Sequence, residues 1–374
     1  MNDKNQTLPS PMTGDNEVVL VAPKPEQALS RRGLLRGSMG TAVLGGLGGL
    51  GGLGALSLSG CGGGNAMAAT PDPTPAPTPA PTPAPTPAPA GTESSITEYS
   101  YNSTVLGGSR YYKVYLPAGY AGSSLRYPVI YLLHGRGDSL SAWGRNKALV
   151  DELISSGKIP PVVLIFPDAP SSDRGNYYVD SAYTNSSMPG AHVETEFMRE
   201  LIPHVDATYR TINNRAARAV GGYSMGGYGA LRYALAYPET FSAAIVMSPA
   251  VYTPLPPAGS SVREFGAFGR GNTLFVDEIY RSKTYPALLD AFNAKGLKLA
   301  IFIAAGDDEY KNSNPAEASN DIDFESALLF NRVSRVPNIS AELRILDGDH
   351  DWVVWQPALR EALPYIFKTL RKPE

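Results

Sequence analysis

A serine set among small residues is the first candidate for chemistry in this chain. Ser224 lies in the run Gly-Gly-Tyr-Ser-Met-Gly-Gly. Residues 216–220 before it are short and apolar enough for a buried strand, and residues 228–237 carry Ala and Leu in a helix-forming run. A serine at such a sharp junction exposes its hydroxyl, and Gly222 and Gly226 lack the side chains that would clash there. The pattern predicts that Ser224 is a nucleophile.

A serine hydroxyl becomes a good nucleophile only beside a base, normally a histidine that a carboxylate orients. Of the four histidines, His350 lies in the polar loop Asp-Gly-Asp-His-Asp-Trp, between an apolar strand and the last helix, and is the predicted base. His134 lies in the loop expected to approach the serine from a neighbouring strand. We interpret His204, inside an amphipathic helix, as structural and His192 as a solvated loop residue.

The orienting carboxylate should follow a strand that lies between the serine and the histidine in sequence. Sheets of this type place their functional groups after the carboxyl ends of the strands. Three neighbouring acids, Asp307, Asp308 and Glu309, follow the strand expected at 297–304. The residues alone leave the choice among the three open.

Backbone amides are the expected donors to the negative oxygen of a tetrahedral intermediate. One is the amide of Met225 at the start of the helix, and the second should lie near Gly135 or Arg136, after the apolar strand 127–133. This chemistry needs no metal and no organic cofactor. The single cysteine and the four histidines show no spacing typical of a zinc site.

Strands alternate with helices along residues 94–374, which predicts an α/β fold: a mostly parallel sheet with helices on both faces. The strands at 111–116 and 127–133 are expected to form a hairpin, and residues 248–284 are expected to be irregular. Further strands are expected at 161–166, 243–247, 297–304 and 340–346, and helices at 146–156, 194–209, 285–295, 323–333 and 353–370.

Residues 1–61 resemble a twin-arginine export signal that ends in a lipobox. The run Ser-Arg-Arg-Gly-Leu-Leu-Arg at 30–36 precedes a Gly- and Leu-rich stretch, and Leu-Ser-Gly-Cys ends at Cys61, the predicted lipidation site. Residues 62–93 are predicted to be an extended linker, because a proline occupies every second position from 71 to 89. The expected location is the bacterial cell envelope, lipid-anchored at the outer membrane or the periplasmic face.

The order Leu-Leu-His-Gly, Gly-Gly-Tyr-Ser-Met-Gly-Gly, Gly-Asp-Asp-Glu and Gly-Asp-His-Asp-Trp resembles the esterase D, antigen 85 and feruloyl esterase superfamily of α/β-hydrolases. The resemblance covers roughly residues 95–370. It implies an α/β-hydrolase fold with Ser224 as the nucleophile and His350 as the base. It also implies that the amides of Met225 and Arg136 form the oxyanion hole.

The acid of this superfamily commonly stands three residues after the glycine, which is the position of Glu309 here. Members usually have Asp there, so Asp308 stays as the alternative. The resemblance implies a serine carboxylic-ester hydrolase that acts on a small-molecule or polysaccharide ester, such as a feruloyl or acetyl ester. Aromatic residues on either side of the serine are candidates for an acyl pocket: Tyr177, Tyr178, Tyr183, Phe265 and Phe268.

Two other functions stay open at the level of the sequence. A serine peptidase of the prolyl oligopeptidase type shares the serine motif, but it usually carries a propeller domain for which this chain is expected to have no room. A non-catalytic surface binding module on the same fold would be expected to have a broken triad. The net charge of −3 gives no electrostatic case for nucleic acid. The expected partners are therefore an ester substrate and, through Cys61, a membrane.

Overall fold

The computed structural model describes residues 18–21, 92–169, 175–185, 189–309 and 314–374, the first of these as backbone only. The chain divides into two units, one of residues 1–24 with 85–374 and one of residues 25–84, and the second lies outside the described residues. Cys61 and the predicted linker repeat also lie outside them. No helix in the described ranges has the length and apolar character needed to cross a membrane.

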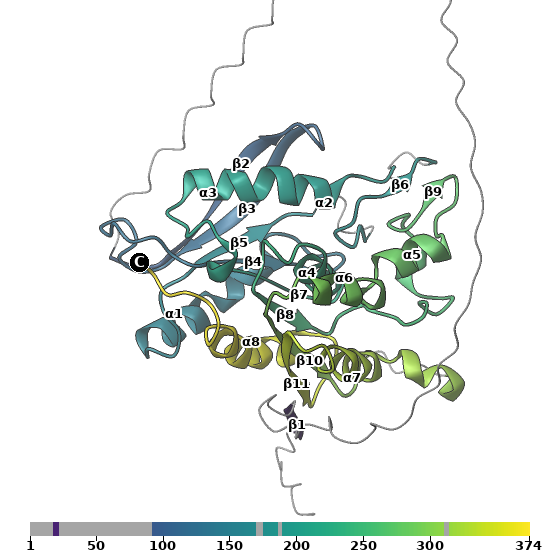
Figure 1. Cartoon of the computed structure of the whole chain (residues 1–374). Coiled ribbons are helices and arrows are strands. Elements are labelled where there is room, and N and C mark those ends of the chain that lie inside the picture. The colour runs from purple at the N-terminus through teal and green to yellow at the C-terminus, as the bar shows by residue number, and fades with distance from the viewer. Residues whose placement is uncertain (1–17, 22–91, 170–174, 186–188, 310–313) are drawn as a thin grey trace, which may run out of the picture. The chain divides into compact units, whose positions relative to one another are not determined.

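A nine-stranded sheet forms the centre of the described domain (Figure 1). The six strands in its middle run parallel to one another, and the three outer strands pair antiparallel. In spatial order the strands are β1 (Val18–Val21), β11 (Ile339–Leu346), β10 (Leu299–Gly306), β8 (Ala243–Met247), β7 (Arg218–Tyr223), β4 (Val129–Leu133), β5 (Val163–Pro167), β3 (Gly108–Leu116) and β2 (Ser95–Ser103). The prediction of a mostly parallel sheet is confirmed.

The helices connect these strands, and two short strands, β6 (Ala182–Tyr183) and β9 (Arg270–Gly271), form a separate pair. The π-helical turn Phe197–Leu201 joins α2 to α3 into one continuous rod. The helices are α1 (Lys147–Ser155), α2 (Val193–Glu196), α3 (Ile202–Thr208), α4 (Met225–Ala236), α5 (Asp277–Lys283), α6 (Leu289–Ala294), α7 (Ile322–Val333) and α8 (Trp352–Ile366).

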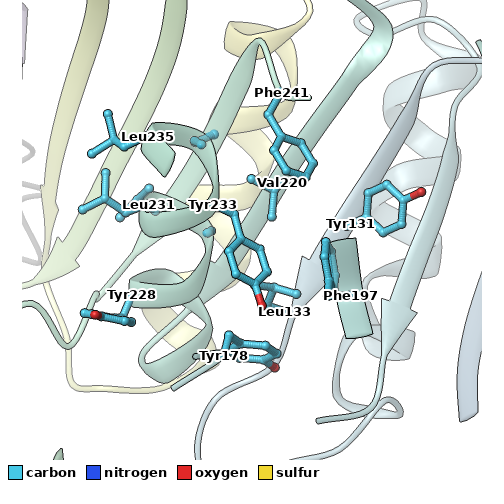
Figure 2. Packing of buried hydrophobic residues seen from close by; sticks show 14 of the residues in the cluster. Tyr131, Leu133, Tyr178, Phe197, Val220, Tyr228, Leu231, Tyr233, Leu235 and Phe241 are labelled. Atoms are coloured by element: carbon cyan, nitrogen blue, oxygen red, sulfur yellow. The ribbon is translucent and has the colours of Figure 1, made fainter. Parts of the chain in front are cut away.

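Both faces of the sheet are buried, as the continuous apolar character of its central strands requires. Along β4, Tyr131 and Leu133 belong to one core while Ile130 and Leu132 belong to the other. The first core packs against α2, α3, α4 and α7, and Figure 2 shows the α4 side of it, where the Tyr233 ring lies 4.8 Å from that of Phe197. The second core packs against α1 and α8, which lie side by side in Figure 1.

The expected hairpin of 111–116 and 127–133 is wrong. Strand β3 pairs antiparallel with β2 and β5, whereas β4 lies between β5 and β7 and runs parallel to both. The physical reason is burial, because a strand that is apolar on both faces lies in the sheet interior. The partner of β3 is β2, a strand that the sequence analysis did not assign. The region 248–284 contains a helix, α5, and the helix expected at 285–295 is divided into a 3₁₀ turn and α6.

Two glutamates on α2 are buried, and their carboxyl groups are stabilised in different ways. Glu194 accepts two hydrogen bonds from the Arg232 guanidinium, at 2.8 and 3.0 Å, and so ties α2 to α4. Glu196 is 6 % exposed, and burial, with a smaller contribution from Glu200, raises the pKa of its carboxyl to about 8. Glu196 is therefore held in its neutral form at neutral pH, and ionising it costs folding free energy.

Glu196→Gln should abolish part of the pH dependence of stability. The folded-state pKa is raised above the unfolded one, so the stability that Glu196 contributes is full below about pH 4.5 and is lost as the pH rises toward 8. The variant should gain roughly 2–4 kcal/mol relative to the parent between pH 5 and pH 9, as measured by denaturant unfolding. Glu278→Gln, exposed on α5, is the control, and equal behaviour of the two variants would contradict the assignment.

Candidate active site

Ser224 joins β7 to α4 in a strained backbone conformation. Its φ of 56° and ψ of −121° lie in a region that residues with a side chain rarely occupy. The surrounding backbone holds it there, since its amide donates to the Met247 carbonyl at 3.0 Å and its carbonyl accepts from the Ala250 amide at 3.2 Å. The side chain is partly exposed at the start of the helix. The junction therefore presents the serine hydroxyl outside the sheet.

The glycines beside Ser224 allow backbone segments to approach more closely than any side chain would permit. A Cβ atom on Gly222 would lie 2.3 Å from the carbonyl oxygen of Gly226, and one on Gly226 would lie 2.3 Å from that of Leu133. Both separations are shorter than any real contact. The role predicted for these two glycines from the sequence is confirmed.

His350 lies in the loop between β11 and α8, and its Nδ1 atom is 2.8 Å from Glu309 Oε2. Glu309 follows β10 and is buried, whereas the neighbouring Asp307 and Asp308 are exposed. The Asp307 carboxylate accepts from the Gly348 amide at 3.1 Å and so braces the histidine loop. Of the three acids that the sequence left open, the one in contact with the histidine is Glu309.

The second oxygen of Glu309 is also occupied. Oε1 accepts hydrogen bonds from the Ser248 hydroxyl and from the Gly306 amide, each at 2.5 Å. A carboxylate with three donors on its two oxygens is fixed in position. Glu309 can therefore fix the orientation of the His350 ring, with Nδ1 toward the acid.

Ser224 and His350 line the same cleft, which has a volume of about 690 Å³. Arg136 of the β4 loop, Tyr252 of the β8 loop and Trp355 of α8 contribute further walls. Polar residues of the segment after β8 and of the turn before α7 complete the lining: Ser260, Ser261, Glu317, Asn320 and Asp321. Groups from the ends of four strands, β4, β7, β8 and β11, thus converge on one solvent-accessible space large enough for an organic ligand.

The loop after β4 packs directly on the serine junction. A Cβ atom on Gly135 would lie 3.3 Å from Ser224 Cβ and 2.7 Å from the Tyr223 ring, and the Tyr223 hydroxyl donates to Asp138 at 2.7 Å. Arg136 is exposed at the cleft, and Met225 is the first residue of α4. The two predicted oxyanion residues therefore belong to segments that meet beside Ser224.

His134 is fixed as part of this loop. It is fully buried, and its Nε2 atom accepts from the Ala169 amide at 3.0 Å. The proton is therefore on Nδ1, which lies 2.9 Å from the Gly135 carbonyl oxygen and donates to it. The Tyr178 hydroxyl donates to the His134 carbonyl at 2.9 Å. These bonds shape the loop that approaches the serine.

The other two histidines lie away from the cleft lining. The His204 ring stacks on Tyr101, its Nε2 atom is 3.0 Å from the Tyr112 hydroxyl, and burial lowers the pKa of its imidazole. The His192 side chain is 65 % exposed in the loop before α2. The structural interpretation of the first and the solvated interpretation of the second are both confirmed.

Of the five aromatic residues considered for an acyl pocket, Tyr177 lines the cleft. Tyr178 and Phe268 are buried and do not line it, and Tyr183 and Phe265 are also absent from the lining. Tyr252 and Trp355 also line the cleft, and Ser248 is a partner of Glu309, although no sequence pattern predicted these roles. Tyr252 and Ser248 follow the carboxyl end of β8, and that position is the signal that could have identified them.

A family model described as "Putative esterase" matches residues 103–366. Esterase Rv1288 from Mycobacterium tuberculosis is 32% identical over 146 residues, which are 39% of this chain and 30% of that protein. An endo-1,4-beta-xylanase/feruloyl esterase from Xylanibacter ruminicola is 33% identical over 152 residues, which are 38% of this chain and 20% of that protein. The chain thus spans less than a third of the length of these curated relatives.

Solved structures agree with this match in fold. A ferulic acid esterase superposes with a TM-score of 0.58 at 27% identity, covering 75% of this chain and 100% of that one. An S-formylglutathione hydrolase from Agrobacterium tumefaciens superposes with a TM-score of 0.57 at 17% identity, covering 75% of this chain and 97% of that one. The fold is that of an α/β-hydrolase, as the sequence predicted.

Exchanging the acids one at a time should distinguish Glu309 from Asp308. Glu309→Gln removes the charge that faces His350, so kcat for 4-nitrophenyl acetate should fall roughly a thousandfold. Asp308→Asn is the matched control because its side chain is exposed on the same loop, and its kcat should stay within about twofold of the parent. A large loss in Asp308→Asn with full activity in Glu309→Gln would reverse the assignment.

Proposed function

Because the chain belongs to the esterase family whose model it matches, we propose that it hydrolyses carboxylic esters through an acyl-enzyme on Ser224. The observation that carries the proposal is the contact of His350 with the buried Glu309, at a cleft that also contains the strained serine junction. A serine, a histidine and a carboxylate from three strand-end loops are the parts that acyl transfer requires.

In the proposed first step, the Ser224 hydroxyl attacks the ester carbonyl carbon and gives its proton to His350 Nε2. The resulting imidazolium faces the Glu309 carboxylate through Nδ1, which stabilises the charge as it forms. The negative oxygen of the tetrahedral intermediate accepts hydrogen bonds from the backbone amides of Met225 and Arg136. Each such donor typically lowers the barrier by about 3 kcal/mol.

In the proposed later steps, the intermediate collapses and the C–O bond to the alcohol breaks. His350 returns its proton to the leaving alkoxide, and the acyl group remains on Ser224. A water molecule then gives a proton to His350 and attacks the acyl carbonyl, after which the carboxylic acid leaves and the serine hydroxyl is restored. The same side chains therefore serve both halves of the reaction.

We further propose that the acyl group is feruloyl or acetyl and that the alcohol belongs to a polysaccharide. A cleft of about 690 Å³ has room for an aromatic acyl group. The aromatic side chains of Tyr177, Tyr252 and Trp355 suit a planar ring, and the hydroxyl and amide groups of Ser260 and Asn320 suit a sugar. A relative and a solved structure that bear the name feruloyl or ferulic acid esterase support this choice.

Rapid-mixing kinetics of the full chain with 4-nitrophenyl acetate and 4-nitrophenyl ferulate test the proposal. We expect a burst of nitrophenol with about one equivalent per chain, and its loss in Ser224→Ala with the circular dichroism spectrum unchanged. Turnover that survives in Ser224→Ala would remove the serine mechanism. If neither ester reacts and a proline-containing peptide is cleaved instead, the peptidase alternative holds, and if nothing reacts, the binding-module alternative holds.

We also propose that residues 1–61 direct export, that Cys61 carries a lipid and that residues 62–93 separate the domain of residues 94–374 from the membrane. The sequence motifs support this location. Cys61→Ser expressed in a bacterium should move the protein from the membrane fraction to the soluble envelope fraction. Arg31→Lys together with Arg32→Lys should instead keep it inside the cell. Continued membrane retention of Cys61→Ser would contradict lipidation.

A further inference from the structure

A buried serine outside the proposed triad lies against its acid. Ser248 directly follows β8, has a left-handed φ of 41° and is fully buried. Its amide donates to the Ala304 carbonyl at 2.6 Å, which anchors this strained residue to β10. A non-glycine residue in this conformation is unfavourable unless its surroundings hold it there. Such a strained conformation is typical of residues with a specific role, which for Ser248 depends on its side chain.

The direction of the hydrogen bonds around Ser248 is determined by the chemistry of its neighbours. The Trp355 Nε1–H group can only donate, and it lies 2.8 Å from Ser248 Oγ. The Ser248 hydroxyl proton is therefore free to point to Glu309 Oε1, 2.5 Å away. The result is a chain of donors that runs from the indole through the hydroxyl to the carboxylate, whose other oxygen faces His350 Nδ1.

This chain stabilises a charge that would otherwise be costly. Glu309 is 1 % exposed, and within the described residues its ion-pair partner is His350. An ionised carboxylate in such a place depends on hydrogen bonds that replace water. The Gly306 amide supplies one and the Ser248 hydroxyl another. The hydroxyl in turn donates more strongly because the Trp355 indole donates to it.

Trp355 also contacts the two ends of the catalytic arrangement. Its ring meets the His350 ring edge-on, with centroids 5.0 Å apart at 87°. The same indole stacks on Tyr223, the residue before Ser224, with centroids 4.2 Å apart at 25°. One side chain of α8 thus connects the base, the acid through Ser248, and the strand end that carries the serine.

We propose that Ser248 and Trp355 are positioning residues that hold the Glu309 carboxylate in place and oriented toward His350. The expected effect on activity rests on the proposed ester hydrolysis. The expected effect on the titration of His350 can be measured without a substrate. Removing the hydroxyl leaves the Glu309 charge less compensated, so the protonated imidazole beside it becomes more favourable. The ring should then give up its proton only at higher pH.

The test uses the full chain labelled with ¹⁵N-histidine, in which four histidines give a countable set of signals. His350→Gln identifies the His350 signals. In Ser248→Ala the titration midpoint of these signals should rise by about 0.5–1 pH unit. The value of kcat/KM for 4-nitrophenyl acetate should fall roughly tenfold, and the acid limb of its pH profile should move by the same amount as the midpoint. Trp355→Phe keeps a ring in place but loses the donor, and should give a smaller shift in the same direction.

Trp143→Phe is the matched control. Trp143 is buried and its ring also packs on Tyr223, but its indole nitrogen has no hydrogen-bond partner among the residues that the structure describes. This variant should leave the His350 titration at the parent midpoint. Because Ser248 and Trp355 act in series, the double variant should match Ser248→Ala rather than add to it.

Two results would overturn the inference: a parent-like His350 titration in Ser248→Ala, or an equal shift in Trp143→Phe and Trp355→Phe. Failure of the proposed function is a different result, because the parent would then show no serine-dependent turnover of esters. The NMR titration would still decide the role of Ser248 in that case, since it does not depend on turnover.

Discussion

The architecture depends on one constraint: a serine with a left-handed backbone must be held at the end of a buried strand. Four non-glycine residues of the described chain have a positive φ: Tyr177, Tyr178, Ser224 and Ser248. Ser224 and Tyr177 line the cleft, Tyr178 bonds to the loop that approaches the serine, and Ser248 bonds to the acid. Strained backbone is thus concentrated at one site, as is common where function demands a specific geometry.

The surrounding sheet explains how this strain is tolerated. The strands β4, β7, β8 and β10 are buried on both faces and lie next to one another, so their carboxyl ends form a rigid edge. Each end supplies one part: the β4 loop packs on the serine junction, β7 leads to Ser224, β8 to Ser248 and β10 to Glu309. The burial that stabilises the fold also brings these four loops together.

Local chemistry made the serine junction predictable from the sequence. Gly222 and Gly226 allow close backbone contacts within a few residues and with the neighbouring strand. The local sequence is therefore enough to predict most of this junction. The choice of acid was not predictable from the residues alone, because Asp307, Asp308 and Glu309 are adjacent and only the packing of β10 against the histidine loop buries one of them.

The hydrogen-bond chain on Glu309 could not be predicted from the sequence. Ser248 is 61 residues from Glu309 and 107 from Trp355, and no local pattern joins them. The expected hairpin failed for a related reason. Nearness in sequence suggested pairing of β3 with β4, but β4 is apolar on both faces and lies between two parallel strands instead. Contacts between distant segments are set by burial, which single-sequence patterns describe only locally.

The most direct test of the central claim is to locate the nucleophile chemically. The full chain would be treated with a 4-nitrophenyl phosphonate ester, digested, and examined by peptide mass spectrometry. The account predicts a single phosphonyl adduct on Ser224, formed far more slowly in His350→Ala. An adduct on a different residue, or none in a preparation that still hydrolyses esters, would contradict it.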